Sequence, residues 1–269
     1  MAPPSPRPSD VFRQVMRPAD GAAWITGASG GSGRAVALRL AADGWHVFAT
    51  ARRAEALDAL ATEARAQALP GRIEPLPADV TDAGAMQAAV ARIEAEGPLA
   101  LVLLNAGIYL PMRAQEFDAE KAKRTFAVNL GGVVNGLDPV LRAMIARGRG
   151  HVAVTASVAG YGGLPGAAAY SATKAGLIAM CEALAMDLMD LGVRLSVVNP
   201  GFVETEATAV NAFEMPFLMT PETAARRIVD GLGRPGFEIA FPRRFALFLR
   251  ALNLLPNRLY LRAWRRLTR

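Results

Sequence analysis

The pentapeptide "YSATK" places a phenol, Tyr170, and an ammonium, Lys174, four residues apart. Side chains at that spacing lie on one face of an α-helix. A tyrosine hydroxyl has an ordinary pKa of about 10 and must be shifted before it can exchange protons at neutral pH. A neighbouring ammonium favours the phenolate and lowers that pKa. The pair predicts a proton-transfer device or, taken alone, a surface helix that carries a lysine.

A glycine-rich turn lies near the start of the chain. The sequence "TGASGGSG" (26–33) separates an apolar run at 22–26 from a candidate helix at 31–43. Glycine lets the backbone turn sharply and approach a ligand closely, and the free N–H groups of a helix N-terminus favour a phosphate. In this strand–turn–helix context the glycines predict a dinucleotide site, although glycines in isolation often form only a turn.

The end of the second apolar run indicates which dinucleotide is bound. A site that prefers NAD(H) needs an acid there to accept a hydrogen bond from the ribose 2′-hydroxyl. Here Ala51 takes that position and is followed by Arg52 and Arg53. Because arginine binds phosphate in a bidentate manner, the sequence favours the 2′-phosphate of NADP(H) over NAD(H). The alternative is a pair of solvated arginines at a helix start.

Short apolar runs and longer alanine-rich stretches alternate along the chain. The runs occupy 22–26, 46–50, 72–77, 99–105, 151–157, 194–200 and 237–241, and the helical stretches 31–43, 54–68, 82–96, 118–147, 168–191 and 221–233. Runs that are apolar on both faces are typical of parallel strands covered by helices on each side. We predict an α/β fold: a Rossmann-like, doubly wound parallel sheet of about seven strands in a single domain, with extra C-terminal helices.

Composition favours one large domain. The chain has 269 residues, of which 52% are hydrophobic and 20% charged, so a sizeable core is expected. We expect a flexible extension at 1–20, the α/β domain at 21–242 and a basic helical tail at 243–269. The single cysteine, Cys181, allows no internal disulfide and fits a reducing cytoplasm. The N-terminus lacks the apolar segment of a secretory signal, and no run of 18 uncharged apolar residues predicts a spanning helix.

Five motifs in order carry a family resemblance. They are TGASGGSG (26–33), LNAG (104–107), Asn129, Ser157 and YSATK (170–174). Together they resemble the short-chain dehydrogenase/reductase family, in its branch with a TG-x3-G-x-G turn, over about residues 20–240. The resemblance implies an NADP(H)-dependent oxidoreductase that interconverts a ketone or aldehyde and an alcohol. An epimerase or dehydratase on the same scaffold, or a non-catalytic NADP(H)-binding regulatory protein, are the alternatives.

The resemblance also implies catalytic roles by position. Tyr170 would give a proton to the carbonyl oxygen during reduction and act as base during oxidation. Lys174 would lower the pKa of Tyr170 and bind the nicotinamide ribose. Ser157 would hold the substrate oxygen, and Asn129 would anchor a water that leads protons to bulk solvent. Two structural alternatives stay open: Asn129 could bond a neighbouring backbone inside its helix, and Ser157 could merely end a strand.

A larger set of residues would contact the cofactor on the same resemblance. Asp79 would contact the adenine, unless it caps the helix expected at 82–96. Ser32 replaces a bulky aliphatic residue common in the family, and the turn lacks the basic residue that some NADP enzymes carry in it. No metal site is predicted. The full set is Gly27, Ser29, Gly30, Gly31, Ser32, Gly33, Arg52, Arg53, Asp79, Val80, Asn105, Ala106, Gly107, Tyr170, Lys174, Pro200, Gly201, Val203 and Thr205.

The substrate is expected to contact two apolar segments, 159–169 and 204–222. Their large side chains, with few fixed polar groups, favour an apolar, aromatic or lipid-like carbonyl compound or alcohol. Helices at 118–147 and 168–191 would form a homodimer or homotetramer interface, as in the family. The pocket residues that we predict are Tyr161, Leu164, Phe213, Met215 and Phe217.

The net charge of +6 belongs to the end of the chain. From residue 239 onward there are eight arginines and no acids, which leaves 22 basic and 24 acidic residues before it. The body is therefore near neutral, and no motif supports nucleic-acid binding. Beyond a break at Pro256, one helical face is expected to carry Arg258, Arg262, Arg265 and Arg269, opposite Tyr260, Ala263, Trp264 and Leu267. This tail could pack over the substrate entrance or a partner subunit, or it could bind anionic lipid at the inner face of a membrane.

Overall fold

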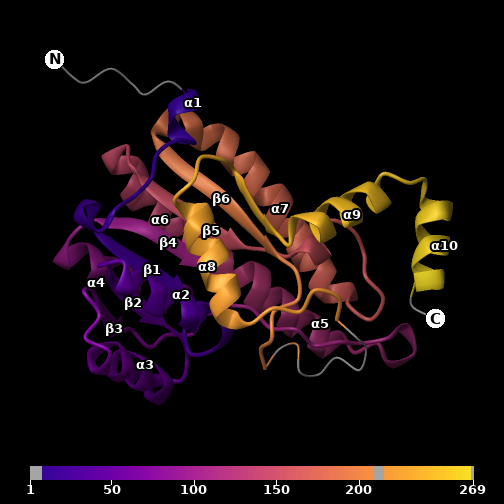
Figure 1. Cartoon of the computed structure of the whole chain (residues 1–269), viewed down its shortest axis with the longest axis horizontal. Helices are drawn as coiled ribbons and strands as arrows, with labels where there is room; N and C mark the ends of the chain where they lie inside the picture. Colours follow the sequence, from indigo (N-terminus) through magenta and orange to yellow (C-terminus); the bar gives the residue numbers. More distant parts are fainter. Residues whose placement is uncertain (1–7, 207, 209–214, 268–269) are drawn as a thin grey trace.

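The computed structural model describes residues 8–206, 208 and 215–267. Seven strands form one parallel sheet in the order β3-β2-β1-β4-β5-β6-β7 (Figure 1). The strands are β1 (Ala22–Thr26), β2 (His46–Thr50), β3 (Arg72–Pro75), β4 (Leu99–Leu104), β5 (Gly150–Thr155), β6 (Val193–Pro200) and β7 (Glu238–Phe241). The doubly wound α/β fold expected from the sequence is confirmed.

Helices cover both faces of the sheet. One core cluster joins the sheet to α2 (Gly31–Ala42), α3 (Ala54–Ala66) and α8 (Pro221–Leu232). The other joins the opposite face to α4 (Ala83–Glu96), α6 (Gly132–Arg147) and α7 (Ala168–Leu188). The short α5 (Ala119–Phe126) precedes α6. This three-layer arrangement explains why a central strand such as β4 is apolar at every position.

Strand β1 illustrates that double burial. Ala23 and Ile25 belong to the core beneath α2 and α8, whereas Ala22 and Trp24 belong to the core beneath α4 and α6. Successive side chains of a strand point to opposite faces, so a strand covered on both sides needs apolar residues at every position. All five residues of β1 are buried.

The order of the strands reverses at β1. The chain moves outward from β1 to β2 and β3, then crosses to β4 on the other side of β1 and continues to β7. In open α/β sheets the crevice at the carboxyl ends of strands on either side of such a reversal is where ligands bind. The residues that follow β1, β4, β5 and β6 therefore meet at one edge.

Several elements differ from their expected bounds by one or two residues, and two expected helices are interrupted or end differently. The stretch 118–147 is α5 and α6 joined by a π-helical turn, η3 (Ala127–Gly131). The stretch 168–191 ends as a 3-10 turn, η5 (Met189–Leu191). Strand β3 stops at Pro75 rather than residue 77, although the Leu76 N–H still donates to the Ala49 carbonyl oxygen of β2 at 2.9 Å. The helix prediction overlooked the π turn because helical periodicity is nearly unchanged across it.

The segment before β1 packs against the domain. It contains α1 (Pro8–Val11) and a 3-10 turn, η1 (Pro18–Asp20). Val11 and Met16 are buried, and the Arg194 guanidinium donates to the carbonyl oxygen of Gln14 at 2.9 Å. From Val11 onward, the extension that was expected to be flexible is in contact with the sheet and its helices.

Two further helices follow β7. They are α9 (Arg243–Asn253) and α10 (Asn257–Leu267), which run in different directions on either side of Pro256 (Figure 1). The expected break at this proline agrees with its missing N–H and its clash with the preceding turn. Among the described residues, no helix has the length and apolar character needed to cross a bilayer.

Candidate active site

The glycine turn is pressed against the end of β4. Thr26 Oγ1 accepts hydrogen bonds from the backbone N–H groups of Asn105 at 3.0 Å and Ala106 at 3.1 Å. Gly27 has a φ of +72°, and a Cβ atom there would lie 2.7 Å from the Ala106 Cα. Only glycine fits this position. The turn after β1 and the Asn-Ala-Gly sequence after β4 thus form one wall.

The same turn leads directly into α2. Gly31 begins the helix with a φ of +54°, and no side chain caps its N-terminus. A Cβ atom on Gly33 would lie 2.3 Å from the Gly27 carbonyl oxygen, so the helix can start this close to the strand only with glycine there. Ser29, Gly30 and the half-buried Ser32 lie along the turn. Its free N–H groups and dipole can hold a pyrophosphate.

The two arginines lie at the rim of this turn. Both Arg52 and Arg53 are exposed, and an Arg53 nitrogen donates to Ser29 Oγ at 3.3 Å. A second Arg53 nitrogen lies 3.6 Å from the exposed Glu206 carboxylate. The Arg52 charge helps to lower the pKa of Asp79. A guanidinium pair beside such a turn is suited to a phosphate group.

Asp79 does not cap a helix. Its carboxylate accepts from the backbone N–H and the hydroxyl of Thr81, both at 2.9 Å, which lowers its pKa. The cap of α4 is Asp82, which accepts from Ala85 N–H at 3.0 Å. The alternative in which Asp79 caps that helix is therefore wrong. The buried Val80 is fixed through its carbonyl oxygen, which accepts from Asn135 Nδ2 at 2.9 Å.

Tyr170 and Lys174 project from one face of α7 toward the ends of β4 and β5. The Lys174 side chain is 3% exposed, and its Nζ donates to the carbonyl oxygen of Thr155 at 2.7 Å. The same Nζ lies 5.5 Å from the centre of the Tyr170 ring. Burial lowers the pKa of Lys174 to about 8. The lysine is thus a buried cation beside the phenol, which excludes the surface-helix alternative.

The pKa of Tyr170 reflects two opposing effects. Burial raises it above the ordinary value, and a hydrogen bond with Ser157 lowers it. The Tyr109 ring, edge-on at 5.1 Å, adds to the rise. The sequence predicts that Lys174 lowers the pKa of Tyr170. In the folded protein, burial raises this pKa by more than Ser157 lowers it. The sequence could not predict this balance because it depends on how deeply the ring is enclosed.

Ser157 ends β5 and links it to β6. Its Oγ accepts from the N–H of Ala159 at 3.1 Å, which caps the short η4 turn (Val158–Gly160). The same hydroxyl lies 3.4 Å from the carbonyl oxygen of Pro200. With its hydrogen bond to Tyr170, the hydroxyl has contacts beyond those of a residue that merely ends a strand.

Asn129 lies in the π turn and holds the loop after β4. Its Oδ1 accepts from the N–H of Ile108 at 2.7 Å, and its Nδ2 donates to the Ile108 carbonyl at 2.9 Å. The Nδ2 also reaches Thr173 Oγ1 at 3.3 Å. A Cβ atom on Gly107 would lie 3.4 Å from Asn129 Oδ1 and 3.6 Å from Lys174 Nζ. The alternative in which Asn129 bonds a backbone group inside its own helix is not what the structure shows. Asn129 bonds the backbone of Ile108, in the loop beside Lys174.

The segment after β6 runs from Ser157 back to the glycine turn. Gly201 N–H donates to the carbonyl oxygen of Phe241 at 2.7 Å, and Val203 pairs with Met219. At its far end, a Cβ atom on Gly31 would lie 2.8 Å from the Thr205 methyl group. Residues 200–205 thus span the gap between the two halves of the site.

The predicted pocket residues have different surroundings. Tyr161 is held by the Glu238 carboxylate at 2.5 Å and lies 4.7 Å beneath the Arg250 guanidinium. Leu164 and Met215 are half-buried, and Phe217 is 61% exposed. Phe213 lies outside the described residues. The Tyr161 hydroxyl is therefore already bound to a carboxylate. Leu164, Met215 and Phe217 stay candidates for the substrate entrance.

Several residues near the site carry no sequence signal. Glu238 also accepts from Asn199 Nδ2 at 2.7 Å and pairs with Arg250 at 2.7 Å, which ties α9 to the end of β6. Phe245 of α9 lies 5.9 Å from the rings of both Phe202 and Phe217. Tyr109 lies edge-on to the Tyr170 ring. No motif or spacing marks them, because each contact joins segments distant in sequence.

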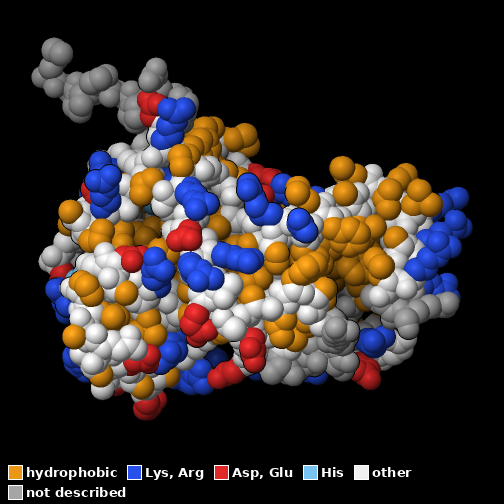
Figure 2. All heavy atoms as spheres, in the orientation of Figure 1, with side chains coloured by type: hydrophobic (Ala, Val, Ile, Leu, Met, Phe, Trp, Pro, Cys, Tyr) orange, Lys and Arg blue, Asp and Glu red, His pale blue; other side chains and the backbone are white. Residues whose placement is uncertain are grey.

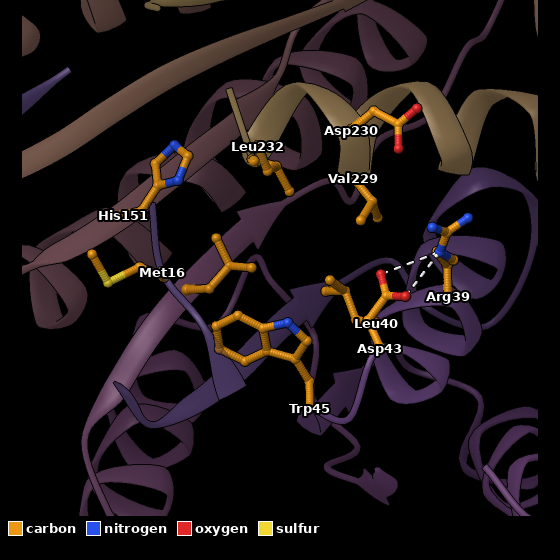
Figure 3. A pocket seen from close by; sticks show the side chains of 11 residues that line it. Met16, Arg39, Leu40, Asp43, Trp45, His151, Val229, Asp230 and Leu232 are labelled. Carbon is orange, nitrogen blue, oxygen red and sulfur yellow. Dashed lines mark hydrogen bonds and ion pairs between the residues drawn. The ribbon is translucent and has the colours of Figure 1, made fainter. Parts of the chain in front are cut away.

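A separate cavity of about 290 Å³ opens at the opposite, amino-terminal edge of the sheet. Met16, Trp45, Leu232 and His151 surround it (Figure 3). Burial and the nearby Arg194 charge hold the pKa of His151 well below its ordinary value, so the imidazole is neutral. His151 and Thr155 lie at opposite ends of β5, about 13 Å apart along the strand. The cavity is therefore remote from Lys174.

One cluster of possible metal ligands lies at the edge of the sheet. His46 Nε2 is 3.1 Å from the Glu74 carboxylate, and Glu96 lies close to both. Arg92 forms ion pairs with Glu74 at 3.2 Å and Glu96 at 2.7 Å. Because a guanidinium already neutralises both carboxylates, we interpret the cluster as a salt-bridge network.

The geometry at the carboxyl edge can be compared with known proteins. The model of the short chain dehydrogenase family matches residues 21–214. An uncharacterized oxidoreductase of Myxococcus xanthus is 42% identical over 91% of this chain and 96% of its own. A 3-oxoacyl-acyl-carrier-protein reductase of Thermotoga maritima is 35% identical over 78% of this chain and 84% of its own.

Solved structures agree with the sequence relatives. A short-chain dehydrogenase from Sphingobium yanoikuyae in complex with NADPH has a TM-score of 0.78 and 26% identity, covering 87% of this chain and 92% of its own. A short-chain dehydrogenase from Streptomyces avermitilis has a TM-score of 0.76 and 29% identity, covering 92% and 97%. With the family model matching well over half of the chain, the protein belongs to the short-chain dehydrogenase family and is an oxidoreductase that binds a nicotinamide cofactor.

Proposed function

We propose that this oxidoreductase interconverts a ketone or aldehyde and an alcohol with NADP(H). The observation that carries the proposal is the buried Lys174 ammonium, 5.5 Å from the Tyr170 ring, with Ser157 hydrogen-bonded to the same tyrosine. A phenol with a hydrogen-bonding hydroxyl on one side and a cation on the other can exchange a proton with a substrate oxygen. The nicotinamide ring, when bound, supplies or accepts the hydride.

The residues present fit such a dinucleotide. The uncapped N-terminus of α2 is suited to the pyrophosphate, and glycine at positions 27 and 33 lets the turn pack directly against Asn105 and Ala106. Arg52 and Arg53 supply the charge for a 2′-phosphate. The similarity to a dehydrogenase solved with NADPH supports the same preference.

The four side chains divide the work in the proposed mechanism. Tyr170 donates a proton to the substrate oxygen during reduction and takes it back during oxidation. Ser157 donates a hydrogen bond to that oxygen and holds it near the phenol. Lys174 favours the phenolate through its charge and contacts the nicotinamide ribose. Asn129 holds the Ile108 loop and anchors the water that carries protons to solvent.

The substrate is proposed to be apolar, aromatic or lipid-like. Beside the entrance, Phe202, Phe217 and Phe245 form a row of rings with centre separations of 5.9 Å. Apolar walls with few fixed polar groups favour a ligand of the same character. The row extends the apolar segment 204–222 with a ring from α9.

We also propose a homodimer or homotetramer formed through α5, α6 and α7. Phe126, Val134 and Met186 on these helices are 41%, 47% and 62% exposed, and apolar side chains exposed on neighbouring helices favour association.

The proposed location is the cytoplasm. A reducing cytoplasm agrees with the buried free thiol of Cys181.

A panel of aldehydes, ketones and alcohols, assayed with NADPH and with NADH, tests the function. We expect turnover with apolar carbonyl compounds, preference for NADPH, and loss of turnover in Tyr170→Phe with NADPH binding within a few-fold. Activity retained by Tyr170→Phe contradicts the proton-donor role. NADPH binding without turnover on any carbonyl favours a regulatory protein, and substrate conversion without net cofactor oxidation favours an epimerase.

A further inference from the structure

Exposed apolar side chains are concentrated in α9 and α10. Seven of the fifteen large apolar side chains that are most exposed among the described residues lie between residues 243 and 267. Leu254 is 86% exposed, and Leu247 and Leu261 are each 65% exposed. The other four are Phe248, Leu255, Leu259 and Leu267. Isolated surface leucines need no explanation, but a cluster of this size indicates an interaction surface.

Helix α9 carries apolar side chains on two opposite sides. Ala246, Leu249 and Leu252 are buried against the domain, and the first two pack with Val158. Leu247 lies about 160° around the helix from Leu249, because successive residues turn by about 100°. The side of α9 that faces away from the domain therefore carries apolar side chains as well, between exposed arginines. A helix that packs only against its own domain would carry polar residues on the opposite, solvent-facing side.

Helix α10 is held to the domain by a few contacts and is otherwise exposed. Tyr260 donates to the carbonyl oxygen of Gly163 at 2.8 Å, and Trp264 packs at the edge of the α9 cluster. None of the described side chains of α10 is fully buried. Its arginines gather at the outer edge of the molecule, beyond the apolar surface over α9 (Figure 2).

The charge of this surface has one sign. Residues 239–269 contain eight arginines and no acid. Arg250 pairs with Glu238, but the other six described arginines form no ion pair with any residue that the structure describes. Those six are Arg243, Arg244, Arg258, Arg262, Arg265 and Arg266.

We infer that α9 and α10 form a docking surface for an anionic lipid bilayer. Exposed leucine and phenylalanine side chains enter the apolar boundary of the bilayer, while the arginines contact the phosphate headgroups. A second copy of the chain fits less well, because symmetric pairing would oppose arginines to arginines with no acid between them. The surface adjoins Phe245 and Phe217 at the entrance, so docking places the entrance near the lipid. The inference does not depend on the proposed reaction.

Co-sedimentation of the full-length protein with vesicles tests the inference. We expect binding to equimolar phosphatidylcholine and phosphatidylglycerol, little binding to phosphatidylcholine alone, and weakening by salt. Each basic side chain at an anionic surface strengthens binding roughly fivefold, so removing four should weaken it at least about tenfold. The variant is Arg258→Gln, Arg262→Gln, Arg265→Gln and Arg266→Gln. Its matched control, with the same loss of charge elsewhere, is Arg13→Gln, Arg65→Gln, Arg226→Gln and Arg234→Gln.

A second variant tests the apolar contribution. Leu247→Ser, Leu254→Ser and Leu261→Ser change side chains that are well exposed, so the fold should be kept while vesicle binding falls at least about tenfold. Absence of binding by the full-length protein, equal binding to both vesicle types, or an equal loss in the charge control would overturn the inference. Loss of an oligomer in the leucine variant, measured by light scattering, would assign the surface to a second copy instead.

Discussion

Lys174 donates a 2.7 Å hydrogen bond to the carbonyl oxygen of Thr155, the last residue of β5. The helix that carries the tyrosine is thereby joined to the strand that leads to Ser157. The bond also fixes a cation in a place where its side chain is 3% exposed. Burying an ammonium costs free energy of folding. The same cost lowers the pKa of Lys174 to about 8.

Replacing Lys174 by methionine should separate stability from activity. The pKa of Lys174 falls from 10.5 to about 8 on folding, so the unfolded chain binds the proton more tightly and the wild type gains stability as pH rises between these values. We expect that gain to be about 2 kcal/mol between pH 7 and pH 9.5, and to be missing in Lys174→Met. Urea unfolding of both proteins at the two pH values measures it. If the stability of Lys174→Met changed with pH as much as that of the wild type, the buried charge would be contradicted. The turnover of Lys174→Met should fall at least about 100-fold.

Replacing Ser157 by alanine should move the pH profile of alcohol oxidation. The hydrogen bond from Ser157 lowers the pKa of Tyr170, against burial, which raises it. Without the hydroxyl the pKa rises further, so the pH at which oxidation becomes half-maximal should move upward, together with a fall in turnover of about 100-fold or more. The check is the pH dependence of oxidation rate in wild type, Ser157→Ala and Ser157→Thr. A profile that keeps its midpoint in Ser157→Ala would remove Ser157 from the control of Tyr170.

Replacing the two rim arginines should change cofactor selectivity. Arg53 reaches Ser29 of the glycine turn, and the Arg52 charge acts on Asp79. A charged hydrogen bond contributes about 1.5–3 kcal/mol, so Arg52→Ala or Arg53→Ala should weaken NADPH about tenfold or more and leave NADH within about twofold. Fluorescence titration with both cofactors measures this, with Arg65→Ala on α3 as the control. Equal weakening of both cofactors would argue against contact with a 2′-phosphate.

The sheet and the glycine turn could be predicted because their physical causes are local. A strand covered on both faces must be apolar throughout, as in β1, and a backbone pressed against Ala106 must be glycine, as at Gly27. The site motifs could be placed in order because parallel strands end at one edge. These features leave a trace in a short window of sequence.

The remaining features depend on contacts between distant segments. The π turn around Asn129 arises where its side chain bonds Ile108, 21 residues earlier, and no periodicity marks it. The rise in the Tyr170 pKa depends on the enclosure of the ring by segments such as the loop of Tyr109. The packing of Val11 and Met16 depends on a surface formed by later strands and helices. Such features require the assembled fold.

Glu238 provides a last prediction, because it joins α9 to the active-site edge. Its carboxylate accepts from Tyr161 at 2.5 Å and pairs with Arg250 at 2.7 Å. Burial and this carboxylate together raise the pKa of Tyr161 well above the ordinary value. In Glu238→Gln the negative charge is lost, so Tyr161 should ionise at a lower pH than in the wild type. The free energy of unfolding should fall by about 1–3 kcal/mol.

Absorbance at alkaline pH follows the ionisation of Tyr161, and Tyr161→Phe identifies its signal among the four tyrosines. A double-mutant cycle of Glu238→Gln with Tyr161→Phe should give a coupling energy of about 1 kcal/mol. An unchanged tyrosine titration in Glu238→Gln would mean that burial alone sets the pKa. Additive losses would mean that the two residues act separately, and α9 would then be held mainly by Ala246, Leu249 and Leu252. A coupled loss with weakened substrate binding would show that the attachment of α9 positions the entrance, since Phe245 on that helix contacts Phe202 and Phe217.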